Sequence, residues 1–124
     1  MDASQCPDLV PIMAVVMALS PGRHEIANAA RLRLKESDRL HAMAVNLRAL
    51  GADVTESPDG LVIQGRAVLR GGAVDSFGDH RIAMSMAIAA LRCEQGVILR
   101  GAQAVNKSYP AFWEDYQRLG GRVL

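Results

Sequence analysis

Two stretches of the chain, residues 7–19 and 79–91, carry apolar side chains on nearly every side of a helical projection. A helix that faced water along one side would show a polar stripe, so this pattern predicts two helices that are covered on most faces. Pro7 and Asp8 suit the first turn of the first helix. The N–H groups of that turn have no partner within the helix, so a proline, which has no N–H, loses no hydrogen bond there. An acidic side chain is stabilised by the positive end of the helix dipole. The Ser-Pro-Gly sequence at 20–22 ends this helix.

The segments between these stretches predict a mixture of helix and strand. Residues 36–50 repeat apolar side chains at helical spacing and run into Gly51, which predicts an amphipathic helix with one buried face. Residues 52–55 and 61–63 flank a Ser-Pro-Asp-Gly turn and predict a β-hairpin. Further short strands are expected at 24–26, 96–99 and 122–124, and a further helix at 111–119.

These elements recur in the same order along the chain. Asp8 and Asp79, at the starts of the two apolar helices, are 71 residues apart. Lys35 and Lys107, each in a polar loop, are 72 residues apart. Self-similarity at one period indicates an internal repeat, here of a unit of about 70 residues.

The two copies are expected at approximately 1–70 and 71–124. Their alternation of strand and helix predicts an α/β (α+β) fold in which helices pack between or behind sheets. The first copy lacks an opening strand and the second lacks a closing hairpin. We therefore expect residues 1–124 to be a single partial domain of a longer protein.

Composition narrows the classes of partner. The 14 Lys and Arg against 13 Asp and Glu give a formal net charge of +1, whereas a nucleic-acid-binding domain normally has a basic excess. The 2 cysteines form neither a disulfide framework nor a C-x-x-C motif, which favours a reduced, cytoplasmic setting. No apolar run approaches the ~18 residues of a membrane span, and no signal peptide is recognisable. We expect neither a nucleic-acid nor a membrane partner.

The segment RLRLKESDRL, residues 31–40, concentrates charge at a loop-to-helix junction. The acidic residues of this segment, Glu36 and Asp38, are expected at a solvent-exposed helix start, because they complement the positive end of the helix dipole. Lys35 and Arg39 are not, because cations are unfavourable at the positive end of a helix. An anion-binding site and a solvated surface both remain open for this segment.

A second group of candidates surrounds the start of the second apolar helix. Asp79 is expected to cap that helix. Arg81 is a cation in the first turn of an otherwise apolar helix, which is unfavourable unless it reaches an acid or a ligand. His80 is either a capping hydrogen-bonding group or part of a site. Lys107 is a candidate because the repeat places it where Lys35 stands in the first copy.

Asp8 is either a simple helix N-terminal acid or, if partly buried beside Lys35, a general base. The chain contains no glycine-rich phosphate loop, no serine nucleophile motif and no pair of histidines at metal-ligand spacing. Cations spread over several loops with acids between them are typical of a site for a small, multiply anionic substrate.

Three segments together carry a specific resemblance: RLKESDRL at 33–40, GDHRIAMS at 78–85 and NKSYPAFWEDYQRLGG at 106–121. They resemble the C-terminal part of the EPSP synthase family, the 3-phosphoshikimate 1-carboxyvinyltransferases. The resemblance implies domains built from three βαβαββ units around buried parallel helices, and a chain that is part of one such domain. It implies an N-terminal domain of the same enzyme as the missing partner.

The resemblance also implies a reaction of aromatic amino acid biosynthesis. The 5-hydroxyl of shikimate 3-phosphate attacks C2 of phosphoenolpyruvate, C3 is protonated, and the tetrahedral intermediate loses phosphate, with no metal or organic cofactor. Carried onto matching positions, Asp8 accepts the hydroxyl proton, Glu36 transfers the proton at C3, and Lys35 contacts anions and assists proton transfer. The resemblance assigns phosphoenolpyruvate binding to Arg39, Arg81 and Lys107, with His80 beside them.

Other interpretations stay open from the sequence. Some family members have Asn as a shikimate-phosphate contact where this chain has Arg31, so we do not assign Arg31 to the site. A UDP-N-acetylglucosamine enolpyruvyl transferase has the same fold, although the KESDR and DHR motifs favour the shikimate branch. A non-catalytic anion-binding domain is the third alternative. We expect the 124-residue chain alone to be inactive, because it carries only one wall of the site.

Overall fold

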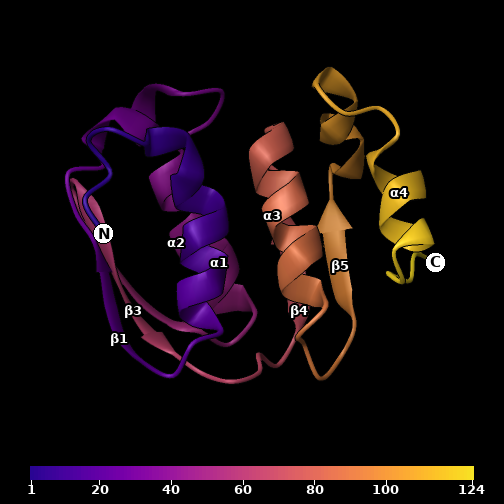
Figure 1. Ribbon diagram of the computed structural model, residues 1–124, viewed down its shortest axis with the longest axis horizontal. Helices are drawn as coiled ribbons and strands as arrows, with labels where there is room; N and C mark the ends of the chain where they lie inside the picture. The colour runs from indigo at the N-terminus through magenta and orange to yellow at the C-terminus, as the bar shows by residue number, and fades with distance from the viewer.

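Three helices lie side by side at the centre of the computed structural model, which describes all residues from 1 to 124 (Figure 1). They are α1 (Val10–Ala18), α2 (Arg39–Ala49) and α3 (His80–Ala90). The apolar helices α1 and α3 are covered on most faces, as their pattern predicts, and each leaves a single residue exposed, Val16 and Ile88 respectively.

A three-stranded antiparallel sheet covers α1 and α2 on one side of the molecule (Figure 1). Its strands are β1 (Gly22–Ile26), β2 (Asp53–Ser57) and β3 (Gly60–Gly65), in the order β1-β3-β2. Val54 of β2 stands opposite Ile63 of β3, and both side chains are buried. The hairpin predicted around the Ser-Pro-Asp-Gly turn is therefore present, with strands slightly longer than expected.

A smaller parallel sheet of β4 (Gly72–Asp75) and β5 (Val97–Arg100) packs against α2 and α3. The first half of the chain has a counterpart of this parallel pairing in a single bridge between Asp2 and Ala27. In both halves a parallel pairing thus flanks an apolar helix, and a 3-10 helix and a further α-helix follow.

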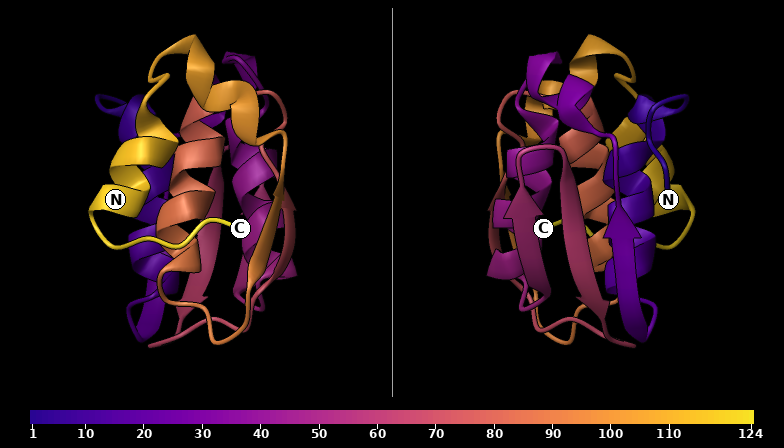
Figure 2. Two further views of the ribbon diagram at one scale, coloured as in Figure 1. Left: turned by 90° about the vertical axis from the view of Figure 1, so that its right-hand side faces the viewer. Right: turned by 90° about the vertical axis from the view of Figure 1, so that its left-hand side faces the viewer.

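The 3-10 helices are η1 (Pro7–Leu9), η2 (Ala30–Leu34) and η3 (Ala102–Lys107), and η2 and η3 lie at the same end of the molecule (Figure 2). The last helix, α4 (Phe112–Arg118), packs beside α3, where Tyr116 Oη donates to the Ala87 carbonyl over 2.8 Å. The Trp113 indole N–H donates to the Ala102 carbonyl over 3.0 Å. The aromatic residues of α4 thus fasten it to α3 and η3.

Several sequence-based expectations are corrected. No strand forms at 122–124, and these residues join neither of the two sheets. The strand β4 was not predicted. The helix predicted at 36–50 begins only at Arg39, because the Asp38 side chain caps it by accepting a hydrogen bond from the His41 N–H over 3.0 Å. The helix predicted at 7–19 opens as η1 before α1 begins.

The core is built from aliphatic side chains, alanine and methionine, and contains no buried aromatic residue. Small side chains let the three central helices approach closely. None of the helices combines the length and apolarity needed to cross a bilayer.

Candidate active site

Asp8 is the meeting point of cations from both halves of the chain. Its Oδ1 lies 3.3 Å from Nη1 of Arg39 and 3.7 Å from Nζ of Lys35, and its Oδ2 lies 3.9 Å from Nη2 of Arg81. The Asp8 side chain is 53% exposed and lies beside Lys35. Because these contacts join η1 to the starts of α2 and α3, the N-termini of both helices open on one face.

Arg39 is the buried residue of this cluster and lies beneath Asp8. Its guanidinium is buried and donates from Nε to Asp79 Oδ2 over 2.8 Å, from Nη2 to Asp79 Oδ1 over 3.3 Å, from Nη1 to Asp8 and from Nη2 to Glu36. Four hydrogen bonds to carboxylates therefore use most of its five N–H donors. Ser37 Oγ completes the surroundings of Asp79 with a hydrogen bond of 2.8 Å to Oδ2.

The Asp79 carboxyl group is fully buried, yet its surroundings favour the ionised form. Burial alone would raise its pKa, but the hydrogen bonds from Arg39 and Ser37, the Arg39 charge and the Arg81 N–H together lower the pKa below its ordinary value. The Asp79 side chain also caps α3, since Oδ1 accepts the Arg81 N–H over 2.9 Å. The predicted cap is therefore present.

The Lys35–Glu36 loop separates η2 from α2 and supplies two of the candidate side chains. Lys35 reaches Asp8, and Glu36 reaches Arg39. The Lys35 side chain is 26% exposed and that of Glu36 is 49% exposed, so both are open to a bound molecule. The two residues thus stand at the rim of the cluster rather than beneath it.

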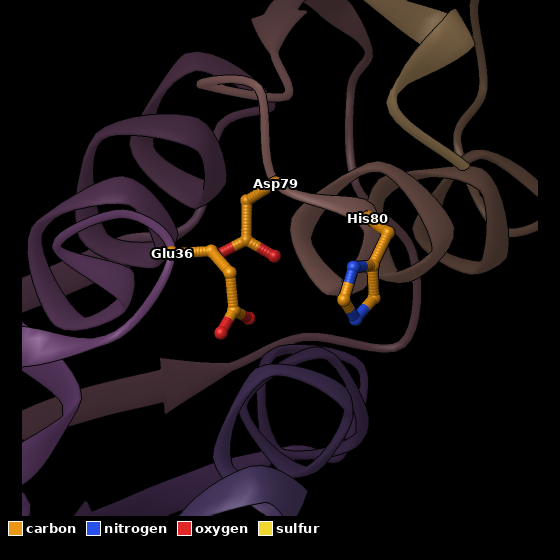
Figure 3. Close-up of side chains that lie close together, drawn as sticks. All are labelled: Glu36, Asp79 and His80. Carbon is orange, nitrogen blue, oxygen red and sulfur yellow. The ribbon is translucent and has the colours of Figure 1, made fainter. Parts of the chain in front are cut away.

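Glu36, Asp79 and His80 converge, with donor atoms within 4.8 Å of one another (Figure 3). The Nδ1 atom of His80 is buried without a hydrogen-bond partner. Both Asp79 oxygens already accept hydrogen bonds, and Glu36 faces the Arg39 cation. This trio therefore offers a metal ion few free lone pairs and a neighbouring positive charge that would repel it.

Lys107 lies across the turn before α3. Its Nζ donates to the Gly78 carbonyl over 2.6 Å, and the side chain is exposed. A shallow groove of about 150 Å³ runs from Asp8 and Arg81 between α1 and α3. The lysine and the groove extend the face on which Asp8 and Arg81 lie.

The structure thus gathers Asp8, Lys35, Glu36, Arg39 and Arg81 into one connected network, with His80 and Lys107 adjacent. Arg31 stands apart, and its Nη1 lies 3.5 Å from the Ser4 carbonyl. Sequence reasoning missed two members of the network. Asp79 was predicted only as a cap, and Ser37 was not singled out, although both stand inside the motifs that carried the other candidates.

Comparison with known proteins identifies the family. The family model described as EPSP synthase (3-phosphoshikimate 1-carboxyvinyltransferase) matches residues 1–116. The chain belongs to the EPSP synthase family. Curated relatives named 3-phosphoshikimate 1-carboxyvinyltransferase include those of Clostridium acetobutylicum, 62% identical over 98% of this chain, and Clostridioides difficile, 53% identical over 98% of this chain. The chain spans about 28% of the length of each.

Solved structures agree with this assignment. An EPSP synthase structure from Acinetobacter baumannii superposes with a TM-score of 0.87 at 36% identity, over 93% of this chain and 27% of that one. The enolpyruvyl transferase NikO from Streptomyces tendae superposes with a TM-score of 0.69 over 93% of this chain at 24% identity, a likeness of fold alone. The fold of this chain is therefore that of part of an enolpyruvyl transferase of the EPSP synthase family.

Proposed function

We propose that residues 1–124 form one wall of the active site of a 3-phosphoshikimate 1-carboxyvinyltransferase. The protein would transfer the carboxyvinyl group of phosphoenolpyruvate to the 5-hydroxyl of shikimate 3-phosphate and release phosphate. The observation that carries this proposal, in a chain of the EPSP synthase family, is the convergence of Lys35, Arg39 and Arg81 on Asp8.

The charges of the site suit two anionic substrates. Arg39 is largely neutralised by Asp79, whereas Lys35, Arg81 and Lys107 keep cationic groups that are at least partly exposed. We assign Arg81 and Lys107 to the phosphate and carboxylate of phosphoenolpyruvate, and the remaining N–H of Arg39 assists them. The positive ends of α2 and α3 add to this field, and charged groups fixed in place act most strongly on charge that develops in the transition state.

Two half-exposed carboxylates are placed for proton transfer. As the 5-hydroxyl oxygen bonds to C2 of phosphoenolpyruvate, the Asp8 carboxylate takes the hydroxyl proton, and Glu36, which enters this step as the carboxylic acid, delivers a proton to C3. The tetrahedral intermediate then expels phosphate while C3 returns its proton to Glu36, which restores the double bond. The proton on Asp8 departs with the phosphate, so both carboxylates end as they began. Lys35, with Nζ 3.7 Å from Oδ1 of Asp8, stabilises the Asp8 carboxylate before it takes this proton and after it gives the proton up.

The remaining substrate contacts would come from the longer part of the protein that the relatives have and this chain does not match. With both walls present, the two substrates are held in the orientation that the bimolecular step requires. The partner of this chain is thus expected to be a second domain of the same enzyme.

A chimeric enzyme tests the proposal. The 124 residues replace the matching segment of the Clostridium acetobutylicum relative, and phosphate release is measured with shikimate 3-phosphate and phosphoenolpyruvate. We expect activity in the chimera and its loss in Asp8→Asn, with activity kept in Asp53→Asn, an exposed carboxylate in β2 at the far end of α2. A folded but inactive chimera, or one that accepts only UDP-N-acetylglucosamine, would contradict the proposal.

A further inference from the structure

Arg33 lies two residues before Lys35 but takes no direct part in the site. Its guanidinium donates from Nε to the Pro58 carbonyl over 2.9 Å and from Nη2 to the Ser57 carbonyl over 2.8 Å. The same Nη2 lies 2.9 Å from Oε2 of Glu56. Arg33 therefore fastens the end of η2 to the turn between β2 and β3.

The third nitrogen of the Arg33 guanidinium, Nη1, bonds to the far end of the loop of residues 34–38. Nη1 of Arg33 donates to Oδ2 of Asp38 over 2.9 Å, while Oδ1 of Asp38 accepts the His41 N–H that caps α2. One carboxylate thus joins Arg33 to the first turn of α2. The ion pair closes a short loop, and Lys35 and Glu36 stand on that loop.

No apolar packing holds the loop in place. Residues 34–38 are all at least partly exposed, and the Leu34 side chain is 87% exposed. Lys35 ends η2 in an extended conformation, with φ −90° and ψ −161°. Polar contacts therefore hold the loop in place. The side chains of residues 35–37 contact the site, and Arg33 and Asp38 join the two ends of the loop.

Glu56 strengthens the attachment of Arg33 to the hairpin. Oε1 of Glu56 lies 2.9 Å from Nδ1 of His41, so this carboxylate contacts both Arg33 and α2. Burial would raise the pKa of Glu56, but the contacts with His41 and Arg33 lower it below its ordinary value, which keeps the carboxylate charged. The hairpin, η2 and α2 are thus held together around the loop.

We propose that Arg33 is a positioning residue, whose planar fork clamps the hairpin turn and Asp38 and so fixes the loop that presents Lys35 and Glu36 to the substrates. This inference rests on the function proposed above. Reacting groups must be held within a fraction of an ångström, because a displacement of ~1 Å can cost on the order of 10²-fold in rate. Lysine cannot replace this clamp, since its single ammonium lacks the geometry of the guanidinium fork.

The first test uses the 124-residue chain and needs no activity. Amide order parameters of residues 35–37 are measured by NMR relaxation in the unsubstituted chain, in Arg33→Gln and in Arg33→Lys. We expect values typical of a rigid backbone, ~0.85, to fall below ~0.6 in both variants. The matched control is Arg48→Gln, because Arg48 also ties α2 to β2, through the Val54 carbonyl at 2.7 Å, but at the other end of the helix. Unchanged order parameters in folded Arg33 variants, or an equal fall in Arg48→Gln, would overturn the proposal.

The second test places the same variants in the chimera. We expect kcat to fall on the order of 10²-fold in Arg33→Gln and Arg33→Lys, and to stay unchanged in Arg48→Gln. If Arg33→Gln does not fold, the kcat of Arg33→Lys, which keeps the positive charge, decides whether the proposal holds. Full activity of Arg33→Lys would overturn the clamp in favour of a simple charge effect. An inactive unsubstituted chimera would instead count against the proposed function, and the order parameters would still decide on the clamp.

Discussion

The Arg39 guanidinium and the Asp79 carboxylate form a bidentate ion pair sealed from water. Nε to Oδ2 is 2.8 Å and Nη2 to Oδ1 is 3.3 Å, and the two side chains are 2% and 0% exposed. The pair joins the first residue of α2 to the N-cap of α3. It therefore links the two halves of the chain directly beneath the candidate site.

Breaking this pair should destabilise the chain far more than breaking an exposed pair. Arg39→Met leaves the Asp79 carboxylate buried without its counter-charge, and such a loss costs about 3–5 kcal/mol. Arg23→Met removes the pair with Glu25 at 3.5 Å, whose side chains are both more than half exposed, and should cost about 0–1 kcal/mol. Urea unfolding of the two variants measures the difference. Equal losses would show that the buried pair contributes no special stability.

The lowered pKa of Asp79 also predicts a pH dependence. A carboxyl whose pKa is lower in the folded state than in the unfolded state adds stability above its unfolded value, and this is lost as the pH falls through its folded value. The unfolding free energy of the unsubstituted chain should therefore exceed that of Asp79→Asn at neutral pH. The excess should shrink once the pH drops below about 3.9, the ordinary value for aspartate. Denaturant unfolding at a series of pH values checks this, and an excess that does not change with pH would contradict it.

The secondary structure that local pattern controls was predictable from the sequence. The apolar helices and the hairpin follow from periodicity within about a dozen residues, and these predictions are confirmed. The strand β4 was not predicted because it is four residues long and begins at Gly72, the second of two consecutive glycines. Its partners are β5 and the side chain of Asn46, which bonds to both the N–H and the carbonyl of Asp75. Neither partner is visible in the local sequence.

In the candidate site, too, features set by the local sequence were predictable and features set by distant partners were not. Arg39 and Arg81 were recognisable as candidates because each stands where a helix dipole disfavours a cation. The counter-charge that explains Arg39 is Asp79, 40 residues further along the chain. Its local role as a helix cap concealed its long-range role, since the spacing of residues does not report which helix starts will meet.

The 124-residue chain by itself should show no measurable turnover. Positioning of two substrates contributes roughly 7–11 kcal/mol to catalysis, so a single wall should be slower than the complete site by at least ~10⁵-fold. Phosphate release with both substrates is compared between the chain alone and the chimera. Turnover by the chain at a rate close to that of the chimera would show that it carries a complete site.

Arg81→Ala in the chimera should weaken the binding of phosphoenolpyruvate much more than the binding of shikimate 3-phosphate. A charged hydrogen bond contributes about 1.5–3 kcal/mol, which corresponds to a rise in the KM for phosphoenolpyruvate of roughly 10- to 150-fold. The control is Arg118→Ala, because Arg118 is 77% exposed on α4. Steady-state kinetics with each substrate varied separate the two effects. An unchanged KM for phosphoenolpyruvate together with an unchanged kcat would reduce Arg81 to a structural residue.

Gly101→Ala should disturb the turn that carries Asp79 into the site. Gly101 adopts φ +75°, and a Cβ atom there would lie 2.4 Å from Oγ of Ser76. That hydroxyl is buried and accepts the Gly78 N–H over 3.2 Å, while the Ser76 carbonyl accepts the Asp79 N–H over 2.9 Å. Ser76 must therefore move, and the start of α3 moves with it.

The matched control is Gly22→Ala, which also forces a positive φ, +113°, but meets no atom within 4 Å. Both variants bear the backbone strain of ~1–3 kcal/mol, and only Gly101→Ala adds the clash with Ser76. Thermal unfolding of the chain should therefore show a larger loss for Gly101→Ala. In the chimera kcat should fall for Gly101→Ala alone, because Arg81 and Lys107 both depend on this turn, Lys107 through its bond to the Gly78 carbonyl. Equal stability losses with equal kcat values would mean that the turn tolerates the extra methyl group and does not control the site.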